Sequence, residues 1–379
     1  MILGVPKETV AGEKRVSVVP DALPRLVGVS VVIEKGAGEA AGFSDSSYTD
    51  KGASIEADAK ALYGNADVVL KVAPPSPSEA DMLKEGSTII SFLYPLANLE
   101  AVRKLSAKKV TAFAMELIPR ISRAQPMDAL SSQSNLAGYK SVVIAADTLP
   151  KIFPLMMTAA GTISPARVFV VGAGVAGLQA IATARRLGAL VEAYDVRPIV
   201  KEQIESLGAK FAQMPVEAKD AQDAGGYAKA QTEEFYKKQQ AFLAGRAAAS
   251  DVVITTALIP GQKAPILISE DAVRSMRPGS VVVDLAAEQG GNCALTEPGK
   301  SIVKYGVTVV GPLNLPSAMA PQASQMYSRN ITSLLLVMLK DGGLAIDVKD
   351  DVIKGSLVIN KGEVVHPGTK NALGGPAAT

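Results

Sequence analysis

The sequence predicts an α/β fold with two successive parallel β-sheets. Short β-rich runs alternate with helical stretches along the chain, which is the pattern of βαβ units. A first series of such runs ends near residue 116, and a fresh series begins near residue 166. The length of 379 residues and the hydrophobic content of 48% are sufficient for two or three globular domains.

The expected strands form two series, separated by helical patterns and by Gly and Pro residues. The first series comprises residues 2–6, 29–36, 66–72, 87–93 and 110–116. The second comprises residues 166–174, 189–196, 209–214, 249–258, 279–286 and 307–311. Each series is long enough to form one sheet.

The C-terminal portion predicts a long helix at roughly 320–340, followed by short strands near 357–360 and 364–367. This portion is too small to fold alone, so we expect it to return and complete the first domain. The predicted domains are therefore 1–130 plus 319–379, an N-terminal α/β domain, and 131–318, a second α/β domain.

A charged, helix-prone insertion covers residues 212–249 and exceeds the usual connection between a helix and a strand. A solvated surface helix accounts for much of it. The corner formed by Gly225, Gly226 and Tyr227 is where we expect a lid hinge, because glycines relax the backbone there.

Composition excludes several classes of protein. A net charge of +2, from 39 basic and 37 acidic residues, gives no reason to expect a nucleic-acid partner. The single cysteine, Cys293, excludes a disulfide framework and favours a reducing compartment. Lys7 and Glu8 interrupt the first apolar run too early for a signal peptide. No segment approaches the ~18 to 20 apolar residues that span a bilayer.

The segment 168–195 carries the strongest functional signal. A buried-type strand leads into Gly172-x-Gly174-x-x-Gly177, and an Ala-rich helix and a second strand follow. In a Rossmann fold the first glycine permits a tight turn, the second lets a pyrophosphate approach, and the third allows close packing of helix on strand. The helix N-terminus offers N–H groups to the anion. The second domain is therefore predicted to be a dinucleotide-binding Rossmann domain.

Asp195 ends the second strand of this unit, 21 residues after Gly174. A carboxylate there can hold both ribose hydroxyls and repel a 2′-phosphate, which favours NAD over NADP. Arg197 tempers this preference, because an arginine there can accept a 2′-phosphate. The expected cofactor contacts are Gly172, Gly174, Val175, Ala176, Gly177, Asp195, Val196 and Arg197.

The loop 255–261 follows the fourth strand of the second series. Loops at the carboxyl ends of parallel strands line the ligand crevice, so Ala257 and Leu258 are expected to contact the adenosine half of the dinucleotide. An ordinary surface loop is the alternative.

Catalytic groups that titrate near neutral pH are scarce. His366 is the only histidine and lies in a terminal stretch where a structural role is expected. One Cys and one His provide neither a zinc site nor a Cys–His pair, so no metal is expected. No GxSxG elbow supports serine-hydrolase chemistry.

The segment 120–135, RISRAQPMDALSSQSN, is rich in hydrogen-bonding side chains but contains no His, Cys or Lys. The planar fork of Arg120 suits a carboxamide or a carboxylate. Asp128 and Ser131 are three residues apart and would share one face of a helix. Alternatively, Asp128 simply caps a helix that begins at Ala129, and the other polar groups face water.

These segments resemble the alanine dehydrogenase/transhydrogenase family. The resemblance rests on GVPKE at Gly4–Glu8, on Glu13, Arg15 and Val16, and on VVGAGVAGLQAIATARRLGA, and it covers essentially the whole chain. RISRAQPMDALSSQSNLAGY and MMTAAGT are similar to the NAD(H)-binding domain of the proton-translocating transhydrogenase branch.

The resemblance implies a reaction and its partners. Hydride would pass directly from NADH on this chain to NADP⁺ on the NADP(H)-binding domain of a partner beta subunit. A membrane-spanning proton-channel domain would couple this transfer to proton movement. The chain would then be a homodimer, peripheral to the cytoplasmic side of the inner membrane through its partner subunits.

Site roles follow from the same resemblance. Arg120 and Ser131 would hold the nicotinamide carboxamide, Asp128 would fix the loop, and Gln125 would reach toward the second nucleotide. Tyr227 corresponds to the tyrosine of a mobile lid. Pro126 departs from the family pattern, which has a small polar residue there, and it would stiffen the loop.

Two other functions remain open. Arg15 and Lys71 lie where the alanine dehydrogenase branch binds its substrate, but Tyr94 stands where that branch has a proton-shuttling histidine. Tyrosine, with an unperturbed pKa of ~10, is a poor substitute for imidazole. A non-catalytic NAD(H)-binding regulatory module is the second alternative. Hydride transfer between two nicotinamides needs no acid or base, only near-attack positioning, which fits the polar segment 120–135.

Overall fold

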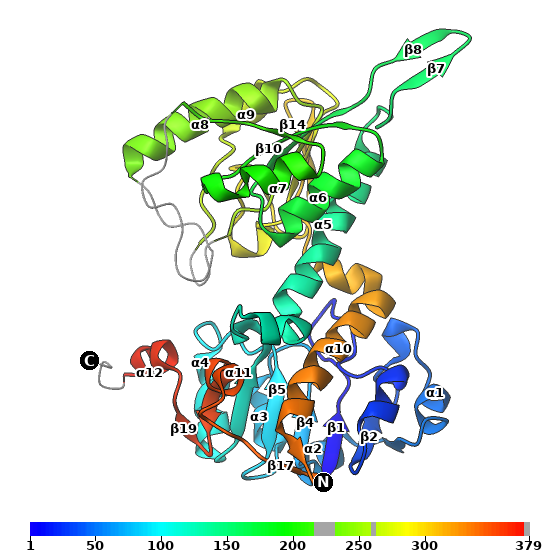
Figure 1. The fold of residues 1–379 in the computed structure, drawn as a ribbon, viewed down its shortest axis with the longest axis vertical. Helices are drawn as coiled ribbons and strands as arrows, with labels where there is room; N and C mark the ends of the chain where they lie inside the picture. The colour runs from blue at the N-terminus through cyan, green and yellow to red at the C-terminus, as the bar shows by residue number, and fades with distance from the viewer. Residues whose placement is uncertain (216–231, 259–262, 375–379) are drawn as a thin grey trace. The chain divides into compact units, whose positions relative to one another are not determined.

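The computed structural model describes residues 1–215, 232–258 and 263–374. The chain folds into two compact units, one formed by Met1–Gln133 with Pro316–Thr379 and the other by Ser134–Leu315 (Figure 1). The expected boundaries, after residues 130 and 318, lie three residues from these. Across the described ranges, no helix combines the length and apolar character needed to cross a membrane.

The first unit is built on an eight-stranded sheet in the order β19-β18-β6-β5-β4-β1-β2-β3. Six strands run parallel, and β18 pairs antiparallel with β6, so C-terminal strands extend the N-terminal sheet. The strands are β1 (Ile2–Val5), β2 (Ser30–Glu34), β3 (Ser54–Glu56), β4 (Val68–Leu70), β5 (Thr88–Ser91), β6 (Thr111–Ala114), β18 (Leu357–Asn360) and β19 (Glu363–Val364).

The second unit contains a seven-stranded sheet in the order β11-β10-β9-β12-β13-β15-β14, parallel except for β14. The chain leaves β9 to form β10 on one side and later adds β12 on the other, which creates a topological switch point beside β9. The strands are β9 (Arg167–Val171), β10 (Leu190–Tyr194), β11 (Lys210–Phe211), β12 (Val252–Thr255), β13 (Val281–Asp284), β14 (Ser301–Lys304) and β15 (Val307–Val310). The predicted α/β class with mostly parallel sheets is confirmed.

Helices cover both sheets (Figure 1). In the first unit these are α1 (Asp45–Thr49), α2 (Ala59–Asn65), α3 (Pro77–Met82), α4 (Leu99–Ala107), α10 (Ala320–Met338), α11 (Asp351–Ser356) and α12 (Pro367–Ala372). In the second unit they are α6 (Val175–Arg186), α7 (Lys201–Ser206), α8 (Glu233–Ala248) and α9 (Glu270–Arg274). The 20-residue α5 (Ala129–Thr148) begins in the first unit and ends in the second.

The apolar helix predicted near 320–340 is α10, and its apolar face lies in the core of the first unit. Tyr327, Ile331, Leu334 and Met338 are fully buried there. Burying each such side chain contributes roughly 1.5–3 kcal/mol. Core packing therefore accounts for the apolar character of this helix.

The insertion at 212–249 forms α8 in its second half, with Thr232 as the N-cap. Phe235, Gln239, Leu243 and Ala247 are buried at four-residue spacing, so one face of α8 packs onto its own sheet rather than being solvated all round. The expected lid residues Gly226 and Tyr227 lie outside the described residues.

A two-stranded hairpin, β7 (Met156–Thr158) and β8 (Gly161–Ile163), follows α5 and projects from the seven-stranded sheet of its unit (Figure 1). Neither strand was predicted. Its large apolar side chains are exposed, with Met157 at 78% and Ile163 at 44%. An isolated two-stranded hairpin is only marginally stable in water.

The middle of α5 packs directly on the beginning of α6. A Cβ at Gly138 would lie 2.1 Å from the carbonyl oxygen of Ala176, whereas a Cβ at Gly245 in α8 would meet no atom within 4 Å. Only glycine at position 138 therefore permits this close approach.

These two glycines predict opposite effects on stability. Gly138→Ala should lower the free energy of unfolding by about 1–3 kcal/mol, because the added methyl overpacks a backbone contact. Gly245→Ala should raise it by about 0.5–1 kcal/mol, because alanine restricts the unfolded chain without a clash. Urea titrations measure both values. Equal shifts in one direction would contradict the packing described.

Candidate nucleotide-binding site

The glycine turn between β9 and α6 is shaped by two close contacts. Gly172 has a φ of 99°, a left-handed conformation that favours glycine, and a Cβ there would lie 2.6 Å from the Oγ1 of Thr256. A Cβ at Gly177 would lie 1.9 Å from the carbonyl oxygen of Gly172. These two glycines allow the helix to sit directly on the end of the strand.

Gly174 differs from its neighbours, because a Cβ there would meet nothing within 4 Å. The residue is exposed and is the N-cap of α6, with no side chain capping the first N–H groups. The N–H groups of Val175 and Ala176 therefore lie at an uncapped, electropositive helix N-terminus beside open space. This arrangement fits the pyrophosphate of a dinucleotide.

Asp195 directly follows β10 and is 8% exposed. Its Oδ2 accepts a hydrogen bond of 2.7 Å from the N–H of Ala173, which ties the acid to the glycine turn. The guanidinium of Arg197 forms a two-pronged contact with the same carboxylate, at 2.8 Å from each oxygen. Position and burial suit a ribose-binding acid, and the arginine contact is an addition that spacing alone did not predict.

The loop after β12 meets the glycine turn within the second unit. The hydroxyl of Thr256 donates to the carbonyl of Gly172 at 3.0 Å. The side chain of Asn292 accepts from the N–H of Ala257 and donates to its carbonyl, both at 2.9 Å. Ala257 is thus fixed on both sides, and Leu258 is 37% exposed.

Asp284 and Asn292 were missed at the sequence level. Asp284 is fully buried and accepts from the hydroxyls of Thr255 and Thr296 and from the N–H groups of Ala286, Asn292 and Cys293. It thereby anchors the segment that carries Asn292. An acid at the carboxyl end of the buried strand 281–284, followed by Gly290 and Gly291, was the available signal.

The polar segment of the first unit is a 3₁₀ turn, η4 (Ser122–Met127), followed by α5. Asp128 accepts from the N–H of Ser131 at 2.9 Å and from its hydroxyl at 2.6 Å. The first bond is that of an N-cap residue. Both sequence interpretations therefore hold for this pair: Asp128 caps α5, and the two side chains also share one face of it.

Side chains from elsewhere in the first unit fasten this turn. The amide of Asn330 in α10 donates to the carbonyl of Pro126 at 2.8 Å and accepts from the hydroxyl of Ser132 at 2.7 Å. Arg123 forms a two-pronged ion pair with Asp350, which lowers the pKa of that carboxyl to about 2. Gln125 is exposed on the fastened turn, and Arg120 is exposed just before it.

The predicted site residues therefore form two groups. Those of the first unit are Arg120, Gln125, Asp128 and Ser131, and those of the second are Gly172, Gly174, Val175, Ala176, Gly177, Asp195, Val196, Arg197, Ala257 and Leu258. Among the described residues, no cluster of three or more His, Cys, Asp or Glu side chains could hold a metal ion. His366 caps α12, its Nδ1 accepting from the N–H of Thr369, a structural contact.

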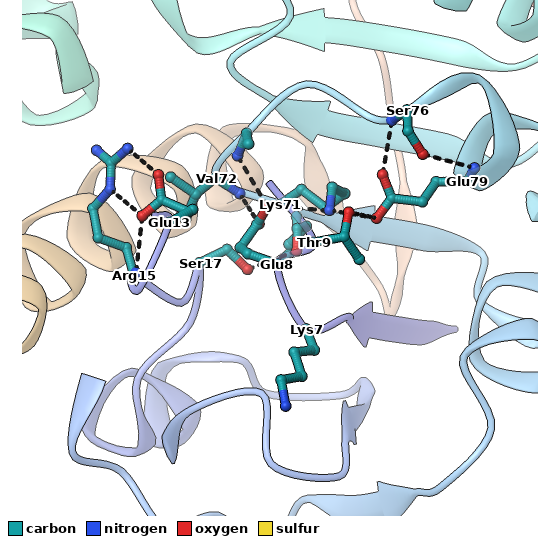
Figure 2. Close-up of polar contacts among 12 residues, drawn as sticks. Lys7, Glu8, Thr9, Glu13, Arg15, Ser17, Lys71, Val72, Ser76 and Glu79 are labelled. Carbon is teal, nitrogen blue, oxygen red and sulfur yellow. Dashed lines mark hydrogen bonds and ion pairs between the residues drawn. The ribbon is translucent and has the colours of Figure 1, made fainter. Parts of the chain in front are cut away.

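A buried charge network lies at the strand ends of the first sheet (Figure 2). The Nζ of Lys71 is 3.1 Å from Glu8 and 2.9 Å from Glu79, and Lys71 is fully buried. Arg15 grips Glu13 with two nitrogens and donates to Gln133 at 3.0 Å. Burial raises the pKa of Glu8, because lost hydration outweighs the attraction of Lys71. The two cations are thus engaged by carboxylates of the chain itself.

The loop after β5 adjoins this network and is clamped by Glu116. The Glu116 carboxylate accepts from the N–H groups of Leu93 and Tyr94, and Tyr94 has a φ of 41°, in the left-handed region. Loss of hydration raises the pKa of Glu116 to about 7, although both backbone contacts favour its ionised form. Its hydrogen bonds hold a loop.

Comparisons with known proteins agree with this architecture. Residues 4–137 match the family model described as alanine dehydrogenase/PNT, N-terminal domain, and residues 141–367 match the corresponding C-terminal domain. An NAD(P) transhydrogenase subunit alpha protein of Rhodospirillum rubrum is 49% identical over 97% of this chain and 98% of its own length.

Two further relatives bracket the chain. The crystal structure of transhydrogenase from Sinorhizobium meliloti is 44% identical, with a TM-score of 0.86 over 96% of this chain and 100% of that chain. Alanine dehydrogenase of Bacillus subtilis is 30% identical over 99% of this chain and 95% of its own length. The chain therefore belongs to the alanine dehydrogenase/transhydrogenase family, and it is more similar to these transhydrogenase proteins than to this alanine dehydrogenase.

Proposed function

We propose that this chain is the NAD(H)-binding component of a proton-translocating transhydrogenase. In this proposal hydride passes directly from NADH on this chain to NADP⁺ on the NADP(H)-binding domain of a beta subunit. The carrying observation is the glycine turn, where an uncapped helix N-terminus, open space at Gly174 and the buried Asp195 meet. The names of the transhydrogenase relatives support the choice of reaction.

Each site residue has a positional role in this proposal. Gly172, Gly174 and Gly177, with the N–H groups of Val175 and Ala176, receive the pyrophosphate. Asp195, flanked by Val196 and Arg197, holds the adenosine ribose, and Ala257 and Leu258 line the adenosine half. Arg120 and Ser131 hold the nicotinamide carboxamide, Asp128 fixes the turn, and Gln125 reaches toward the second nucleotide. Gly226 and Tyr227 belong to a lid.

The chemistry asks these residues for geometry. NADH supplies the hydride, and no proton moves to or from a side chain in that step. Two rings must approach to ~3 to 3.5 Å in line for transfer, which amounts to a positioning task. The bonds of Asp128, Asn330 and Asp350 fasten the polar turn and reduce the freedom of Gln125 and Ser131.

Oxidative deamination of an amino acid is the second candidate. It is favoured by Arg15 and Lys71, which lie where the alanine dehydrogenase branch binds substrate. Both cations are engaged by carboxylates of this chain, however, and Tyr94 occupies the place of the proton-shuttling histidine. The lower identity to alanine dehydrogenases, 29–30%, also weighs against it. A regulatory NAD(H) sensor would have no use for the fastened polar turn.

Assembly completes the proposal. The alpha-subunit relatives imply partner subunits, and we place this chain on the cytoplasmic side of the inner membrane, held there by a membrane-spanning proton-channel domain. We also propose a homodimer. The exposed apolar side chains of the β7–β8 hairpin support it, because a second copy would remove that surface from water.

The reaction is tested by mixing the chain with the NADP(H)-binding partner domain and following hydride transfer from NADH to an NADP analogue. We expect Gln125→Ala and Asp128→Asn to lower the single-turnover rate about 10- to 100-fold, because misplacing the rings slows transfer. Asparagine at position 128 retains the helix cap. NADH affinity should change less than about threefold, since the lost interactions act on geometry.

Gln203→Ala, an exposed glutamine on α7, is the matched control and should transfer hydride at the unaltered rate. Full-speed transfer by both site variants would refute the roles assigned to the polar turn. No stimulated rate with the unaltered chain would leave the sensor candidate standing. Prompt NADH formation from alanine and NAD⁺ by the chain alone would favour deamination instead.

The dimer is tested at the hairpin. Met157→Asp should shift the chain from dimer to monomer in sedimentation equilibrium, because a buried unpaired carboxylate is costly at an interface. Val303→Asp, at a residue 67% exposed on the edge strand β14, should leave the dimer intact. A dimer unaffected by Met157→Asp, or a monomeric unaltered chain, would contradict this assembly.

A further inference from the structure

All acceptor positions of the Asp195 carboxylate are already used. Oδ1 accepts the backbone N–H of Arg197 at 2.9 Å and its Nε at 2.8 Å. Oδ2 accepts the N–H of Ala173 at 2.7 Å and the Nη2 of Arg197 at 2.8 Å. A carboxylate offers about four lone-pair sites, so these four bonds saturate it. The side chains of Asp195 and Arg197 are only 6% and 14% exposed.

The four donors differ in how easily they can leave. The N–H of Ala173 belongs to the glycine turn, and the N–H of Arg197 belongs to the backbone that enters the short turn η5 (Pro198–Val200), so both are fixed by the fold. The guanidinium is carried by a flexible side chain. Ribose hydroxyls can therefore reach this carboxylate only by displacing the guanidinium.

Displacement leaves a cation next to the ribose 2′ position. An arginine fork is always charged and binds phosphate oxygens with two parallel hydrogen bonds. A lone aspartate would repel a 2′-phosphate, whereas Asp195 and Arg197 together carry no net charge. The pair thus opposes a 2′-hydroxyl through competition and favours a 2′-phosphate through attraction.

We infer that Arg197 is a specificity-determining residue, which competes with the ribose hydroxyls of NAD(H) for Asp195 and provides the counter-charge for the 2′-phosphate of NADP(H). The site therefore prefers NAD(H) by a smaller factor than its aspartate alone would impose. This inference rests on the proposed function, in which Asp195 holds the adenosine ribose. It assigns the arginine a binding role of its own.

The test is a pair of fluorescence titrations, with NADH and with NADPH, on the unaltered chain and on Arg197→Gln. Loss of the competitor should leave the Kd for NADH unchanged or lower it. Loss of the counter-charge should raise the Kd for NADPH. The ratio of the Kd for NADPH to that for NADH should therefore rise about tenfold or more. Thermal unfolding of each variant checks that the fold is retained.

Two further variants isolate the cause. Arg246→Gln removes the same charge from an ion pair with Glu192 on the same strand, 3.0 Å apart, and should leave the ratio unchanged. Arg197→Lys keeps the charge without the fork, so it should bind NADPH more tightly than Arg197→Gln does. It also remains informative if the glutamine variant fails to fold.

The outcomes separate this inference from the proposed function. If the unaltered chain binds NADH but Arg197→Gln leaves the ratio unchanged, or weakens both nucleotides equally, the role assigned to Arg197 is overturned and the site stands. Lysine no better than glutamine would overturn the counter-charge role. If the unaltered chain does not bind NADH, the proposed function falls and this inference falls with it.

Discussion

The contact between Gly177 and the carbonyl of Gly172 is the constraint on which the nucleotide site depends. A single methyl group at Gly177 would lie 1.9 Å from that oxygen, so only glycine lets α6 begin directly over the end of β9. This seat points the uncapped N–H groups of α6 at the open space beside Gly174. It also brings the N–H of Ala173 to Asp195 and the carbonyl of Gly172 to Thr256. Pyrophosphate, ribose and adenosine contacts all follow from one close approach.

The two units solve different physical problems. The second unit presents backbone N–H groups and a buried acid, which suit the charged and polyhydroxylated half of a dinucleotide. The first unit fastens a short turn with a helix cap, an amide from α10 and an exposed ion pair, and on that turn it carries groups that donate or accept hydrogen bonds without titrating near neutral pH. Meanwhile Arg15 and Lys71, the cations a deaminating enzyme would offer to its substrate, are paired internally. The inventory suits holding and aligning a coenzyme better than moving protons.

The features that could be predicted from sequence are those set by local geometry. The turn at Gly172–Gly177, the acid at Asp195 and the cap at Asp128 follow from backbone sterics and short spacings, and the run of apolar segments indicated the two sheets. The rest depends on contacts between distant segments. Asn292 reaches Ala257 across 35 residues, and Asn330 reaches Pro126 across 204, and no local pattern encodes such pairs. Arg197 was noticed by its position, but its saturation of Asp195 is a matter of side-chain geometry, and the β7–β8 hairpin is too short to leave a periodic signal.

The central claim is that this chain aligns a reduced dinucleotide and contributes no proton to the reaction. Its most direct test is the pH dependence of single-turnover hydride transfer, with the NADP(H)-binding partner domain present and both nucleotides saturating. Glu116 is the sharp internal reference, because its pKa is about 7 and it lies in the loop region where a deaminating enzyme would need its proton shuttle. The account predicts a rate constant that is flat from about pH 6 to about pH 9, in the unaltered chain and in Glu116→Gln alike. A titration near pH 7 that disappears in Glu116→Gln would place a proton donor in the reaction and contradict the claim.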